Sequence, residues 1–84
     1  MEEKKYAFDY GKLRGRIVEK FDTAGKFVTY LPLKMVRETL SLKLNNKSDF
    51  SQTEIMAFCD TLEIPYEEIP VYFFDTKGRD INTE

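Results

Sequence analysis

The chain has no histidine, and cysteine occurs once, at Cys59. Without histidine, imidazole-based catalysis and most zinc sites are excluded. A single cysteine excludes an internal disulfide, and the absence of a signal peptide predicts a cytoplasmic protein. No apolar run approaches the roughly 18 residues that a membrane-spanning helix needs. We therefore expect no enzymatic activity, metal, cofactor, small-molecule substrate or membrane insertion.

The 84 residues are enough for one small domain, in which about 60–65% of the unfolded chain's surface is buried. Hydrophobic residues make up 42% of the sequence and include seven Phe and five Tyr, which suffices for one core. We predict a single domain over residues 1–84, ordered over about 7–75. The charged N-terminus is expected to fray, and the polar tail 76–84 is expected to be disordered.

The net charge of −2 is unevenly distributed along the chain. Residues 1–47 contain 11 Lys and Arg against 6 Asp and Glu, whereas residues 48–84 contain 2 against 9. Local charge attracts phosphate, so the basic half is a candidate nucleic-acid surface. The alternative is that these lysines are ordinary solvated surface residues.

Two short helices joined by a turn are predicted over 24–31 and 36–45. Thr23 is a good N-cap for the first helix, and Pro32 prevents the helix from continuing. The inward-facing stripes of the two helices consist of Phe27, Val28 and Leu31, and of Val36, Leu40 and Leu44. Two packed helices with a polar outer face on the second indicate a helix-turn-helix, for which DNA is the leading partner.

The rest of the chain also predicts helices, so the fold class is all-α with four to five short helices. Asp9 is placed to begin a helix over about 10–21, and Ser51 with Glu54 forms a capping box that begins a fourth helix. Pro65 is placed to open a fifth helix, which Pro70 limits to about one turn. The expected inward-facing residues of the first and fourth helices are Leu13, Ile17, Val18, Phe21, Ile55, Phe58, Cys59 and Leu62.

The outer face of helix 36–45 supplies the candidate base-contacting residues, which are Arg37, Glu38, Ser41 and Asn45. Arginine pairs with guanine, glutamate accepts from cytosine and asparagine pairs with adenine. Alternatives remain for three of them: Arg37 in a surface ion pair, Glu38 stabilising the helix start, and Asn45 only ending the helix. Leu42 is expected to pack under the adjacent helix rather than to contact a thymine methyl.

Phosphate contacts position a protein on DNA without reading its sequence. The candidates for such contacts are Thr23, Lys26, Lys43, Lys47, Arg14 and Arg16.

Four segments resemble a family of small phage proteins from Gram-positive hosts that are described as Cro-like repressors. These segments are FDYGKLRGRIVEKF (8–21), TLSLKLNNK (39–47), FSQTEI (50–55) and IPVYFF (69–74). The resemblance implies a five-helix, lambda-repressor-like domain that binds operator DNA in a bacterial host cell. The segment between the two central helices is two residues longer than usual. Val36 stands where a capping hydroxyl is expected, and if it is the cap, about 1 kcal/mol of helix stabilisation is missing. Alternatively, the second helix starts earlier, at Lys34 or Met35, and its outer face is tilted from the usual angle.

Operator affinity rarely comes from a single reading helix, so a weak homodimer is also predicted. Its candidate surface is Val71, Tyr72, Phe73 and Phe74, although the same residues are equally suited to fold back onto the core. A second hypothesis is a protein-binding module, such as a phage antirepressor or inhibitor. In that hypothesis the acidic C-terminal half, over about 60–75, contacts the partner.

Overall fold

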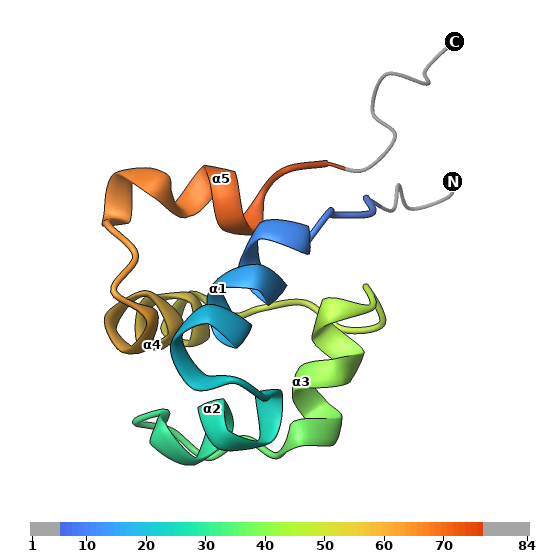
Figure 1. Cartoon of the computed structure of the whole chain (residues 1–84). Helices are drawn as coiled ribbons and strands as arrows, with labels where there is room; N and C mark the ends of the chain where they lie inside the picture. Colours follow the sequence, from blue (N-terminus) through green and yellow to red (C-terminus); the bar gives the residue numbers. More distant parts are fainter. Residues whose placement is uncertain (1–5, 77–84) are drawn as a thin grey trace, which may run out of the picture.

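The computed structural model describes residues 6–76, which form five α-helices and one short 3-10 helix (Figure 1). The helices are α1 (Gly11–Phe21), α2 (Ala24–Tyr30), α3 (Arg37–Leu44), α4 (Gln52–Leu62), η1 (Tyr66–Glu68) and α5 (Ile69–Phe73). The part of the chain that is described contains no β-strand beyond one bridge, between Phe8 and Thr76. The all-α prediction is confirmed, and α2 and α3 form the helix-turn-helix. Except for Tyr6 and Thr76, the residues of the predicted frayed end (1–6) and disordered tail (76–84) lie outside the described part of the chain.

The starts of α2 and α4 are those predicted from their capping residues. The Thr23 hydroxyl accepts a hydrogen bond of 3.1 Å from the backbone N–H of Lys26. The Ser51 hydroxyl accepts from the Glu54 N–H at 3.1 Å, and Glu54 accepts in return from the Ser51 N–H at 2.9 Å. Val36 is the N-cap of α3 and makes no side-chain capping bond, so the first of the two alternatives for the start of α3 holds and α3 lacks this stabilisation.

The prediction that Pro70 ends the fifth helix is wrong. The turn that follows Pro65 is a 3-10 helix, and Pro70 lies in the first turn of α5. Proline is tolerated there because its missing N–H has no partner within the helix at that position. The helix therefore continues to Phe73, whose side chain is only 2% exposed.

One core joins all five α-helices, and aromatic rings occupy its centre. Phe58 of α4 lies edge-on to Phe27 of α2 and to Phe50, with ring centroids 4.9 and 5.2 Å apart. Cys59 is buried in this core, as predicted, and burial raises the pKa of its thiol. Val18 was expected to face inward, but it is 58% exposed, and the buried residues of α1 are Leu13 and Ile17.

The two ends of the described chain are fastened together beside α5 (Figure 1). The Asp9 N–H donates to the Asp75 carbonyl at 2.7 Å, next to the bridge between Phe8 and Thr76. The Asn46 side chain accepts from the Phe8 N–H at 2.8 Å and donates to the Phe8 carbonyl at 3.0 Å. The N-terminal segment is thus held between α5 and the loop that follows α3.

Candidate interaction surfaces

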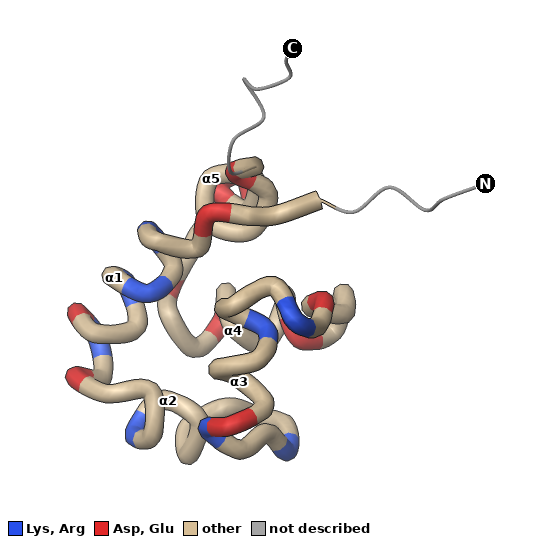
Figure 2. Tube along the Cα trace, turned by 90° about the vertical axis from the view of Figure 1, so that its right-hand side faces the viewer, with Lys and Arg blue, Asp and Glu red and all other residues tan. Residues whose placement is uncertain are grey.

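The outer face of α3 is exposed, as a reading helix requires, but it is not strongly basic. Arg37, Glu38 and Ser41 are all exposed. The Arg37 guanidinium lies 3.9 Å from the Glu38 carboxylate, so opposite charges adjoin at the start of α3 (Figure 2). Leu42 is 52% exposed, so the prediction that it packs under a neighbouring helix is wrong. This face is mixed in charge and has an apolar centre.

Two predicted DNA contacts, Asn45 and Arg14, bind each other instead of being free. The Asn45 amide donates to the Ser41 carbonyl at 2.9 Å, and its oxygen accepts from Arg14 at 3.1 Å. Arg14 also donates to the Leu44 carbonyl at 3.2 Å. The bond to Leu44 satisfies a carbonyl that the end of α3 leaves without a helical partner, and the two bonds from Arg14 attach α1 to the end of α3.

The prediction that Lys43 contacts phosphate does not fit the structure, because this side chain is buried. Lys43 is 7% exposed, and its ammonium lies 3.1 Å from the Glu54 carboxylate. The ammonium also donates to the Asp49 carbonyl at 2.7 Å and lies 5.8 Å from the centre of the Phe50 ring. Lys43 therefore links α3 to the start of α4 through buried contacts.

The remaining candidates for phosphate contacts differ in whether their polar side-chain groups already have partners within the protein. Arg16 donates to the carbonyls of Leu62 and Glu63, at 3.0 and 2.8 Å, and so fastens α1 to the end of α4. Lys26 is exposed but lies 3.6 Å from Asp22. Lys47 is exposed in the loop after α3, and the Thr23 hydroxyl is used in capping α2.

The Lys43–Glu54 ion pair makes stability depend on pH in the acidic range. Burial raises the pKa of Glu54, but hydrogen bonds from Ser51 and Lys43 and the charge of Lys43 outweigh it, so the net pKa is below 4.5. A carboxyl with a lowered folded pKa adds stability above its unfolded pKa and loses it as pH falls through the folded value. We expect the urea midpoint to fall with pH below about 4.5, and to fall less steeply in Glu54→Gln. Parallel profiles for the two proteins would contradict this assignment.

The C-terminal half carries an acidic surface, which we define as the exposed residues of α4, η1 and α5 together with Phe74, the residue that follows α5. Residues 48–76 contain seven Asp and Glu and no Lys or Arg. The Tyr66 hydroxyl donates to the Asp60 carboxylate at 3.0 Å, which places η1 against α4. The exposed members of the acidic surface used below are Met56, Asp60, Tyr66, Glu67, Glu68, Val71 and Phe74. It combines negative charge with exposed apolar side chains.

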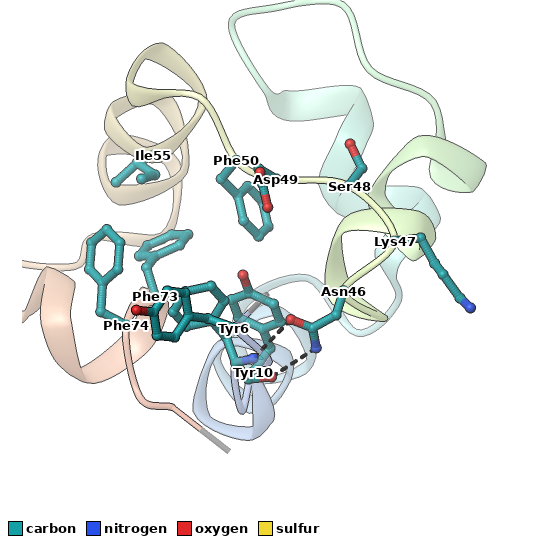
Figure 3. A pocket seen from close by; sticks show the side chains of 11 residues that line it. Tyr6, Tyr10, Asn46, Lys47, Ser48, Asp49, Phe50, Ile55, Phe73 and Phe74 are labelled. Atoms are coloured by element: carbon teal, nitrogen blue, oxygen red, sulfur yellow. Dashed lines mark hydrogen bonds between the residues drawn. The ribbon is translucent and has the colours of Figure 1, made fainter. Parts of the chain in front are cut away.

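An open cavity of about 530 Å³ lies where the N-terminal segment, the loop after α3 and the end of α5 meet (Figure 3). Its lining consists of Tyr6, Phe8, Tyr10, Asn46, Lys47, Ser48, Asp49, Phe50, Ile55, Phe73 and Phe74. This cavity was not predicted from the sequence. Asn46 was not among the predicted site residues, although its side chain holds Phe8 in place. The density of aromatic residues was the one signal that pointed to the cavity.

Two kinds of site are absent from the part of the chain that the structure describes. No group of three or more histidine, cysteine, aspartate or glutamate side chains is arranged to hold a metal ion there. None of the helices in that part is long and apolar enough to cross a membrane.

Five short helices with an exposed α3 define a small helix-turn-helix domain. The chain belongs to the family described as "Protein of unknown function (DUF739)", whose model matches residues 6–76. It is also similar to the modulator of repression (MOR) of the temperate bacteriophage TP901-1 from Lactococcus lactis, known from a solution structure. The two share 38% identity with a TM-score of 0.69, over 81% of this chain and 89% of the other. No curated protein matches the chain.

Proposed function

We propose that this protein modulates phage repression by binding a cationic protein partner, the phage repressor, through its acidic surface. The proposal rests on one observation: several of the basic residues predicted to bind DNA are used inside the protein, whereas acidic residues are exposed. Lys43, Arg14 and Arg16 are used in internal contacts, whereas residues 48–76 present acidic and apolar groups with no Lys or Arg. The similarity to a modulator of repression supports the same reading.

The physical basis of the proposal is charge complementarity. A repressor's DNA-binding face is rich in Lys and Arg, because it must neutralise phosphates. An acidic surface attracts that face and competes with DNA for it, and the exposed Val71 and Phe74 add apolar contact area. The proposal assigns the protein no catalytic role, and places its action in the cytoplasm of the bacterial host.

The same charge argument bears on the predicted homodimer. Phe73 is buried and Tyr72 is half-buried, so only Val71 and Phe74 of the predicted surface remain exposed. A symmetric contact through this surface would bring like charges together, which is unfavourable. We therefore favour a different, cationic protein over a second copy as the partner of this surface.

The second candidate function is direct reading of operator DNA by α3, in the Cro-like manner that the family resemblance implies. Arg37 and Ser41 favour it, because both are exposed on the outer face of α3. Lys26 and Lys47 are exposed nearby in sequence and would contact phosphate.

The two functions are separated by measuring how tightly the repressor of the same phage genome binds labelled operator duplex, with and without this protein. We expect the wild-type protein to weaken the repressor–operator complex. Reversing two charges on η1, in Glu67→Lys/Glu68→Lys, should raise the concentration needed for half of this effect by about tenfold or more.

Arg37→Ala is the matched variant on the other surface, and it should leave the effect on the repressor unchanged. The reverse pattern would overturn the proposal: tight, salt-dependent binding of operator by this protein alone, lost in Arg37→Ala and retained in the doubly reversed variant. That outcome would support the second candidate function.

A further inference from the structure

The cavity beside the N-terminal segment contains a buried polar atom that the protein leaves unpaired. Tyr10 is only 6% exposed and lines the cavity, with its ring 5.4 Å from Phe50 and 6.0 Å from Phe8 between centroids. Its hydroxyl has no hydrogen-bond partner among the described residues. Buried tyrosine hydroxyls usually have one, so this atom points to a ligand that supplies the missing bond.

The cavity wall offers negative charge beside this hydroxyl. Asp49 lines the same cavity, and Lys47 extends away from it (Figure 3). Lys43 lies near Phe50, but its charge is balanced by Glu54. Burial raises the pKa of Tyr10 and the charge of Asp49 raises it further, so the phenol stays protonated at neutral pH. The polar end of the cavity is therefore a carboxylate next to a neutral hydroxyl.

The wall also contains the polar residues Asn46, Lys47 and Ser48, and its apolar part is largely aromatic, with Phe8, Phe50, Phe73 and Phe74 around the space. A guanidinium group fits both the polar part and the aromatic part of such a site. It is flat, it stacks on aromatic rings, and it carries five donors and no acceptor. Both Asp49 and the Tyr10 hydroxyl can accept hydrogen bonds from it. The volume of about 530 Å³ leaves room for the residues that flank an arginine in a partner chain.

We propose that this cavity is the anchor site for an arginine side chain of the cationic partner protein. The guanidinium donates to the Asp49 carboxylate and the Tyr10 hydroxyl, and its alkyl stem lies against the aromatic rings. Phe74 belongs both to the cavity lining and to the acidic surface, so an anchored arginine lies at the edge of the docked partner. The inference rests on the proposed function and names the part of the partner that is recognised.

The test uses two blocked tripeptides, acetyl-Ala-Arg-Ala-amide and its citrulline counterpart, which has nearly the same shape but no charge. Each is titrated into the full chain while the backbone amide signals of residues 46–50 are followed by NMR. We expect saturable shifts with the arginine peptide, and a dissociation constant about tenfold higher with the citrulline peptide.

Three variants identify the groups responsible. Asp49→Asn should weaken binding of the arginine peptide by about tenfold, and Tyr10→Phe by about threefold. Glu19→Gln removes one carboxylate outside both the cavity and the acidic surface, and it should leave the dissociation constant unchanged. Because the Tyr10 hydroxyl is unpaired, Tyr10→Phe should unfold at a urea concentration no lower than that of the wild type, so a loss of binding cannot come from unfolding.

Equal binding of the two peptides, or equal binding of the arginine peptide by the wild type and Asp49→Asn, would overturn the inference. The proposed function fails differently. If the arginine peptide binds as expected but the protein leaves the repressor–operator complex unchanged, the anchor site stands and the proposed function falls. If the protein weakens that complex but the peptide does not shift residues 46–50, the function stands and the anchor site falls.

Discussion

Replacing Lys43 by methionine is expected to lower the free energy of unfolding by about 3 kcal/mol, because removing one partner of a buried ion pair strands the other. The stranded partner is the Glu54 carboxylate, 3.1 Å away and 21% exposed. The variant also loses the hydrogen bond to the Asp49 carbonyl. Urea denaturation followed by circular dichroism measures the change.

The double variant Lys43→Met/Glu54→Gln is the control for this prediction. Glutamine removes the stranded charge and can still accept from the Ser51 N–H, so the double variant should be more stable than Lys43→Met. A urea midpoint of Lys43→Met equal to that of the wild type would show that the pair is solvated. An expected loss of this size also makes Lys43 unsuitable for testing DNA binding, since a loss of binding would report unfolding.

Replacing Phe58 by alanine is expected to cost about 4 kcal/mol, the range seen when a buried aromatic ring leaves a cavity. Phe58 is fully buried and its ring contacts those of Phe27, Phe50 and Phe73. A domain of this size has about 5–10 kcal/mol of stability, so thermal unfolding should begin near room temperature. The exposed Tyr6 supplies the control: Tyr6→Ala should change stability by less than about 0.5 kcal/mol. Equal losses in the two variants would contradict the assignment of the core.

Helix positions and their starts were predictable from the sequence because local groups determine them. Thr23 and the pair Ser51 and Glu54 cap helices through bonds that span three residues. The start of α3 at Val36, without such a bond, was one of two alternatives that the sequence left open. The prediction failed at Pro70, because proline fits the first turn of a helix as well as it ends one.

The candidate site was less predictable, because its properties depend on contacts between distant segments. Lys43 follows Leu42 on a short helix. The sequence alone does not reveal that Lys43 is buried in an ion pair with Glu54 while Leu42 is exposed. Arg14 and Arg16 are basic residues of α1 whose carbonyl partners lie 30 and 46 positions away. Pairings over such distances follow from tertiary packing and leave no periodic signal.

The contacts that hold the two chain ends together determine when the cavity forms during folding. The Phe8 segment, one wall of the cavity, is held by Asn46, 38 positions away, and by the bridge to Thr76. Contacts at such separations carry the largest loop-closure entropy, so they form after the local helices. A chain still on the ribosome can therefore form α1 to α4 before this wall is in place. Synthesis must reach the end of α5 and the segment that follows it before the cavity is complete.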